Sequence, residues 1–89
     1  MSSIFVDVKG NMSPVRPAGR SFTIDELKVL LICERVTMQN LGNFYLAYDA
    51  RARSWCRFNK IASMWCESAG SNVEVFGSAI LIEKDLWKN

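Results

Sequence analysis

The residues best suited to chemistry lie close together in one segment, RARSWCRFNKIASMWC, which runs from 51 to 66. The segment combines four cations, two tryptophans, a phenylalanine and two cysteines. Such residues occur in three kinds of site: a nucleic-acid grip, part of a metal centre, or a contact surface for another protein. The spacing of the residues and the composition of the whole chain separate these alternatives.

The cysteines do not have the spacing of a metal site. Cys56 and Cys66 are ten residues apart and Cys33 lies far upstream, whereas zinc sites pair cysteines about two to four residues apart so that one turn presents both thiolates. The chain has no histidine, the commonest general base and a frequent zinc ligand. The carboxylates are scattered or lie in a helix cap. We therefore expect free thiols, no metal, no cofactor and no enzymatic activity.

The basic residues of this segment have two interpretations. Aromatic rings between guanidinium groups grip single-stranded nucleic acids by stacking on the bases. In an antiparallel strand, however, alternate side chains face opposite sides, so that the rings can be core and the arginines solvated. The net charge is only +2, from 11 Lys and Arg against 9 Asp and Glu, and no basic stripe continues beyond the segment. A nucleic-acid-binding module that uses residues 51–60 is thus the alternative hypothesis.

A protein contact is the principal hypothesis. The chain is rich in aromatic residues, with five Phe, three Trp and two Tyr. Tyrosine and tryptophan are favoured in contact hot spots because the rigid ring is buried while a polar atom still finds a partner. We expect a hairpin to present the partner-binding residues, which are Tyr48, Arg51, Arg53, Trp55, Arg57 and Lys60.

The length and composition predict one ordered domain. At 89 residues the chain is too short for two cores, so we assign 1–89 to a single domain. The hydrophobic fraction of 49% and the charged fraction of 22% are ordinary for a globular protein. No apolar run approaches the roughly 20 residues that span a bilayer, and the start MSSIFVDV has no secretory leader. We expect no membrane partner and a location in the cytoplasm.

The N-terminal half contains the clearest local signals. SIFVDVKG alternates as a strand does and meets a turn at Gly10. MSPVRPAG has two prolines, which lack a backbone donor, and so predicts a short edge strand or an extended loop. Thr23 and Glu26 form a capping box, and Phe22 and Leu27 a hydrophobic staple. Both devices predict a helix that begins at the same place and runs from about 23 to 33, with an apolar stripe of Ile24, Leu27, Leu30, Leu31 and Cys33.

The C-terminal half predicts further strands and a second helix. VTMQN and FYLAY favour strands on either side of a turn at 40–43, and SWCRF is expected to return as the antiparallel partner of FYLAY. Asn59 can cap a short helix that Gly70 ends. The last strand has apolar groups on both faces around Ile80 to Ile82, which predicts a central position, and Gly77 indicates a bulge or a close backbone approach.

These elements predict an α+β fold, with a mostly antiparallel sheet of four to six strands packed with one main helix and one short helix. Four stretches in this order, FTIDELKVLL, NFYLAYDA, FNKIAS and VFGSAILI, resemble the small phage and mobile-element proteins of domain-of-unknown-function family 3846. The resemblance covers about residues 4–83 and rests on positions such as Asn59, Ala62 and Gly77. It implies a compact α+β domain and a virus or plasmid origin, and it transfers no catalytic residue.

Size, the lack of catalytic groups and the resemblance together lead to a functional expectation. We expect a non-enzymatic accessory protein of a phage or mobile element, located in the host cell cytoplasm. Its partner would be a host protein or a protein–nucleic-acid complex, and it would act as an inhibitor of a host defence system, in the manner of anti-CRISPR proteins.

Overall fold

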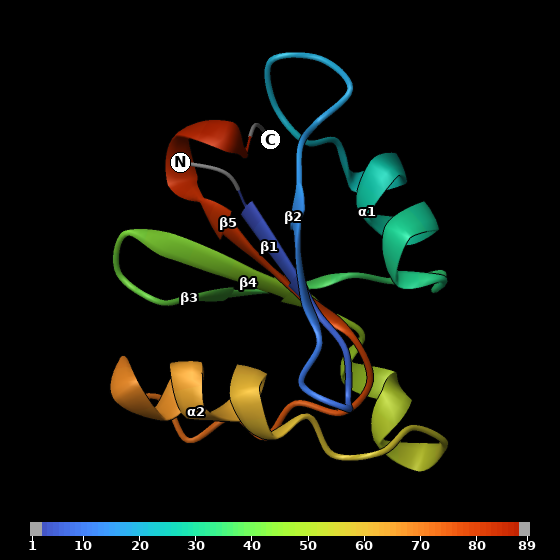
Figure 1. The fold of residues 1–89 in the computed structure, drawn as a ribbon, viewed down its shortest axis with the longest axis vertical. Helices are drawn as coiled ribbons and strands as arrows, with labels where there is room; N and C mark the ends of the chain where they lie inside the picture. Colours follow the sequence, from blue (N-terminus) through green and yellow to red (C-terminus); the bar gives the residue numbers. More distant parts are fainter. Residues whose placement is uncertain (1–2, 88–89) are drawn as a thin grey trace.

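The computed structural model describes residues 3–87 and contains one antiparallel sheet with a helix on each face (Figure 1). The sheet order is β2-β1-β5-β4-β3, and every neighbouring pair is antiparallel. The predicted α+β class, with its mostly antiparallel sheet and two helices, is confirmed. The elements in chain order are β1 (Ser3–Val6), β2 (Met12–Val15), α1 (Ile24–Leu31), β3 (Thr37–Asn40), β4 (Phe44–Tyr48), η1 (Ala50–Ser54, a 3₁₀ helix), α2 (Lys60–Ser68), β5 (Ala79–Glu83) and η2 (Lys84–Leu86, a 3₁₀ helix).

The sheet separates two hydrophobic cores. Leu46 of β4 packs in the core with Ala62 and Cys66 of α2. The next residue, Ala47, faces the opposite side and packs in the core with Leu27 of α1. This alternation is the two-residue period of a strand. Because both faces of the sheet are covered, central β5 is apolar on both sides, and its predicted central position is confirmed.

The capping box and staple start α1 as predicted. The Thr23 hydroxyl accepts a hydrogen bond from the Glu26 N–H at 3.2 Å, and Glu26 Oε1 accepts one from the Thr23 N–H at 3.2 Å. Phe22 and Leu27 are both fully buried in the same core. Glu26 Oε2 also accepts a hydrogen bond from the Ala18 N–H at 2.8 Å, which ties the preceding loop to the helix. The local sequence therefore fixes both the start of α1 and the path into it.

Asn59 caps α2 and is itself fully buried. Its Oδ1 accepts a hydrogen bond from the Ala62 N–H at 3.0 Å. Its Nδ2 donates to the backbone oxygen of Gly77 at 2.9 Å and to that of Val6 at 3.3 Å. At the other end Gly70 has φ +82°, the left-handed conformation that stops a helix cheaply only at glycine. The predicted cap and stop of α2 are thus confirmed.

The predicted hairpin between FYLAY and SWCRF is wrong. β4 pairs with β3 on one side and with β5 on the other, so neither of its edges is open to residues 54–58. The chain after β4 turns into η1 instead, because Asp49 Oδ1 accepts the Arg51 N–H at 2.9 Å and starts a helical turn. Phe58 makes only an isolated bridge, to Phe76.

The N-terminal strands agree with the sequence pattern. β2, which contains Pro14, is an edge strand of the sheet, one of the two placements that its prolines allow. In β1 the fully buried Val6 belongs to the α2 side, whereas Phe5 packs on the α1 side, as the predicted alternation requires. α1, however, ends at Leu31 rather than at 33, because Ile32 adopts a left-handed conformation.

We expect Asn59→Ala to lower the free energy of unfolding by about 3 kcal/mol or more, because each buried group left without a partner costs about 1–3 kcal/mol. Thr23→Ala is the matched comparison, since it removes a cap that is exposed to water and should cost about 1 kcal/mol. Chemical denaturation followed by tryptophan fluorescence measures both. Equal losses in the two variants would contradict the central role of Asn59, and an unchanged midpoint for Thr23→Ala would mean that α1 does not depend on its capping box.

Candidate functional site

Small residues allow η1 to pack closely against the segment that precedes β5. Buried Ala52 of η1 lies over Gly77, whose φ is +79°. A Cβ added at Gly77 would lie 3.4 Å from the Ala52 Cβ and 3.3 Å from the Cys56 Sγ. The close backbone approach predicted at Gly77 is therefore confirmed. With Ala52 facing inward, the side chains of Arg51 and Arg53 on either side of it are exposed.

Tyr48 does not belong to this surface, and its prediction as a contact residue is wrong. Its exposed fraction is 6%, and it lies in the core between β4 and α2. Burial raises the pKa of Tyr48, with a smaller contribution from Cys66. The cause is the register of β4, in which Leu46 and Tyr48 share the face that α2 covers.

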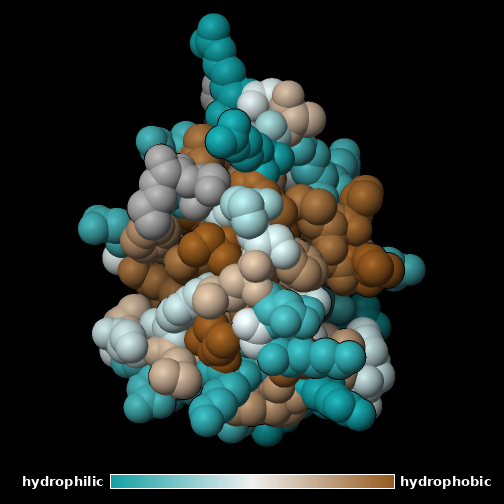
Figure 2. Space-filling view, viewed as in Figure 1, coloured by the Kyte–Doolittle hydropathy of each residue, from teal (hydrophilic) through white to brown (hydrophobic). Residues whose placement is uncertain are grey.

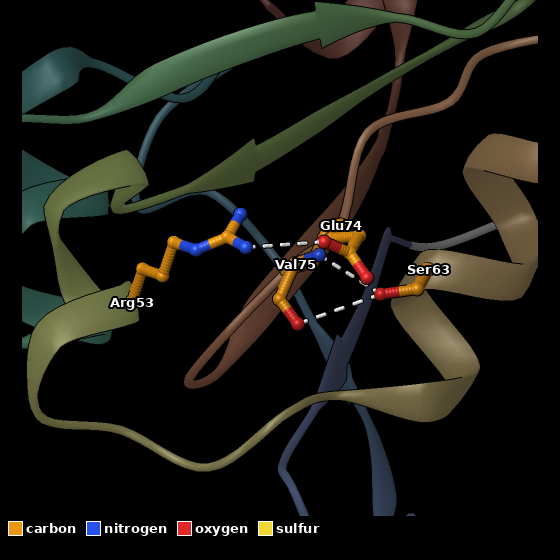
Figure 3. Close-up of polar contacts among 4 residues, drawn as sticks. All are labelled: Arg53, Ser63, Glu74 and Val75. Atoms are coloured by element: carbon orange, nitrogen blue, oxygen red, sulfur yellow. Dashed lines mark hydrogen bonds and ion pairs between the residues drawn. The ribbon is translucent and has the colours of Figure 1, made fainter.

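The side chain of Arg53 makes contacts within the molecule. Its guanidinium group lies 3.4 Å from the Glu74 carboxylate and 5.2 Å from the centroid of the Phe76 ring. From the other side, Ser63 Oγ of α2 accepts the Val75 N–H at 2.9 Å (Figure 3). The segment that contains residues 74–76 is thus held between η1 and α2. Because the Arg53–Glu74 pair is exposed, it contributes at most about 1 kcal/mol.

The remaining basic residues of the segment flank the buried cap of α2. Arg57 and Lys60 are exposed on either side of Asn59. The Arg57 backbone oxygen accepts the Gly77 N–H at 2.9 Å, so its backbone is fixed although its side chain is free to reach solvent. Phe58 packs edge-on against Phe76, with ring centroids 5.5 Å apart and an interplanar angle of 70°. The six predicted contact residues therefore do not form one cluster.

Arg51 and Trp55 meet the loop that follows α1. They line a small pocket of about 110 Å³ together with Glu34, Arg35 and Asp49. Trp55 is 65% exposed, so a large aromatic side chain faces mainly solvent. Two acidic and two basic side chains surround the pocket, so that their charges balance and give no strong positive potential.

Ile32, at the end of α1, is a functional candidate that the sequence pattern missed. Its backbone is left-handed, with φ 52° and ψ 56°, and its side chain is 91% exposed. The Ile32 N–H donates to the Val29 oxygen at 3.2 Å and the Cys33 N–H to the Lys28 oxygen at 3.0 Å, which is the Schellman ending of a helix. Glycine usually occupies this position, because a side chain there costs about 1–2 kcal/mol.

Val29 extends this apolar surface by one helical turn. Its side chain is 76% exposed, and with Leu30 it lines an open groove of about 450 Å³ beside Arg16 and Ala18. Figure 2 shows hydrophobic side chains gathered on the side of the molecule where α1 lies. We define the α1–η1 surface as the two exposed apolar residues at the end of α1 together with the residues that line the small pocket: Val29, Ile32, Glu34, Arg35, Asp49, Arg51 and Trp55.

The sequence of α1 contains a signal for this exposed surface. Of the predicted apolar stripe only Leu27 is fully buried, whereas Ile24 and Leu30 are exposed to solvent. Val29 and Ile32 lie outside that stripe, and no glycine or asparagine follows the helix in LLICE. Apolar residues off the buried stripe, together with a missing helix-ending residue, indicate an exposed apolar patch.

The three cysteines are free thiols. Burial raises the pKa of Cys66. Burial also raises the pKa of Cys33, and the negative charge of Asp49 adds to this effect. A raised pKa leaves less of the reactive thiolate at neutral pH. Within residues 3–87 no three cysteine, aspartate or glutamate side chains lie close enough together to hold a metal ion.

We expect Ile32→Gly to raise the free energy of unfolding by about 1 kcal/mol, because glycine removes the strain of the left-handed conformation at little loss of burial. Val29→Gly is the matched control, three residues earlier and also exposed, but inside the helix, where glycine costs about 1 kcal/mol relative to alanine. The shift of the urea midpoint measures both variants. A loss of stability in Ile32→Gly would show that the side chain of Ile32 contributes to the fold.

Comparison of the chain with family models, with curated proteins and with solved structures finds no match. In the described part of the chain, no helix combines the length and the hydrophobicity needed to cross a membrane.

Proposed function

We propose that this protein is a non-enzymatic binding protein whose α1–η1 surface docks on a host protein, either alone or within a protein–nucleic-acid complex. The observation that carries the proposal is Ile32, which is apolar, almost fully exposed and in a strained conformation. A phage or mobile-element origin and a role as inhibitor of a host defence system are also part of the proposal. They rest on the resemblance to domain-of-unknown-function family 3846 alone.

Folding does not account for Ile32. An exposed side chain gains nothing from the core, and the left-handed backbone costs about 1–2 kcal/mol. Local strain that the fold does not need is commonly associated with function. Burial of an isoleucine side chain against a partner stabilises a complex by about 1.5–3 kcal/mol, which exceeds the strain. A partner contact therefore gives this residue a physical role.

The rest of the surface has the composition of a contact hot spot. Trp55 supplies a rigid aromatic ring, and tryptophan and arginine are enriched where binding energy is concentrated. Arg51 and Arg35 alternate with Asp49 and Glu34 around the small pocket. Mixed charges favour one orientation of a complementary protein and reject others. The partner surface would thus be apolar at its centre, with charges of both signs at its rim.

Nucleic-acid binding remains the second candidate, because Arg57, Lys60 and the ring of Phe58 are exposed. Two observations weigh against it. Arg53 is paired with Glu74, and the charges around Trp55 balance. A polyanion is held mainly by uncompensated cations.

The first test is capture from host lysate, with and without nuclease, followed by titration of the captured protein. We expect Ile32→Gly and Trp55→Ala each to weaken binding at least tenfold, although Ile32→Gly makes the free protein more stable. Met64→Ala is the matched control, because Met64 is an exposed apolar residue on α2, away from the α1–η1 surface. Equal affinity in all four proteins would contradict the assignment of the surface.

The second test distinguishes the two classes of partner by salt and charge reversal. For a protein partner we expect Trp55→Ala to cost more affinity than Arg51→Glu combined with Arg57→Glu, with a modest dependence on salt. For nucleic acid the charge reversal should cost more, and the affinity of the unmodified protein should fall steeply with salt because counterions are released on binding. Arg53 is left unchanged in these variants because its substitution would also break the pair with Glu74.

A further inference from the structure

We infer that the open edge of β3 is a self-association site, at which β3 of a second copy of this chain adds antiparallel and continues the sheet. The inference rests on backbone hydrogen bonding and is independent of the proposed function.

The backbone groups of Met38 and Asn40 point away from the sheet. In an antiparallel pair, alternate residues exchange hydrogen bonds with the neighbouring strand and the residues between them point to the other side. The Leu41 N–H donates to the Phe44 oxygen at 2.8 Å, which fixes the phase of this alternation. By the register of β3 and β4, Thr37 and Gln39 then bond to β4.

The N–H and C=O groups of Met38 and Asn40 therefore form a row of unpaired backbone groups that another extended strand can satisfy in full. Within residues 3–87, β3 is paired with β4 and with no other strand. Asn40 is exposed and Gln39 is half-buried, so that the edge is within reach of a partner strand.

The two edges of the sheet differ in protection. β2 contains Pro14, which lacks a backbone donor. Edge strands are commonly protected in this way or by charged side chains. β3 has neither device, since no proline and no charged residue occurs from 36 to 43. Because β2 lacks a backbone donor at Pro14, the β3 edge is the better site for an added strand. Pairing of two β3 edges about a two-fold axis uses both of them and gives a closed dimer rather than a fibre.

The sequence of β3 suits pairing with itself. The run from Thr37 to Leu41 that bonds to β4 is centred on Gln39. A two-fold axis through this centre sets Gln39 opposite Gln39 of the second copy, and Met38 opposite Asn40. A glutamine amide both donates and accepts, so two of them can bond to each other. No like charges meet across the axis.

The area of such a contact is small, because only a short strand pairs. Interfaces below about 1,200 Å² are weak or transient. We expect a dissociation constant between about 1 µM and 1 mM.

The test is sedimentation equilibrium over this concentration range. The unmodified protein should form a dimer reversibly. Gln39→Lys and Gln39→Glu each place like charges opposite one another and should weaken the dimer at least tenfold when studied alone. An equimolar mixture of the two variants should associate at least as tightly as the unmodified protein, because opposite charges then face each other. Ser13→Lys, on the β2 edge, is the matched control and should not change association.

A second measurement needs no variant. Hydrogen exchange of the Met38 and Asn40 amides should slow as the concentration of the unmodified protein rises, whereas amides of β2 should not change. The inference is overturned if the unmodified protein stays monomeric at millimolar concentration, if these two amides exchange at a rate independent of concentration, or if folded Gln39 variants dimerise like the unmodified protein. It is also overturned if the mixture fails to associate.

Discussion

The buried side chain of Asn59 is the interaction on which the arrangement of this small protein depends. A buried amide is tolerated only when its donors and its acceptor are satisfied. Here they are satisfied by three different parts of the chain: the last residue of β1, the segment before β5 and the first turn of α2. The backbone N–H of Asn59 adds a fourth link, to the Val75 oxygen at 2.8 Å. One residue therefore sets the position of α2 relative to the sheet.

The consequences extend to the candidate surface. The hydrogen bond from Asn59 fixes Gly77, and Gly77 has no Cβ, so that Ala52 and Cys56 can lie directly over it. This contact holds η1 against the end of the sheet and leaves Trp55 exposed. The packing around Asn59 and Gly77 thus determines where the binding candidates lie, although Asn59, Gly77 and Ala52 are themselves buried.

The sequence allowed the helix caps to be predicted, but it did not determine which strands pair over long distances in the chain. The caps of α1 and α2 involve residues three apart, so that their residue types are sufficient to identify them. The central position of β5 followed from apolar groups on both of its faces. The hairpin prediction failed because two segments were candidates for the same edge of β4. β5 takes that edge and places Ala79, Ile80 and Ile82 in the two cores. The strain at Ile32 could not be predicted, since residue types do not give φ; only the missing glycine pointed to it.

The two surface features are related through β3. Thr37 pairs with Tyr48, and the next residue, Asp49, is the cap of η1, so the α1–η1 surface lies at the Thr37 end of this strand. In a dimer whose two-fold axis passes beside Gln39, the two α1–η1 surfaces would lie at opposite ends of the paired β3 strands. Two weak contacts to the same partner give a much higher overall affinity than one, because the second contact forms within the complex. This requires a partner that presents two sites at a matching separation. The open edge of β3 and the exposed Ile32 are separate features of the fold, and in the proposed dimer the two-fold axis would give each assembly two copies of the α1–η1 surface.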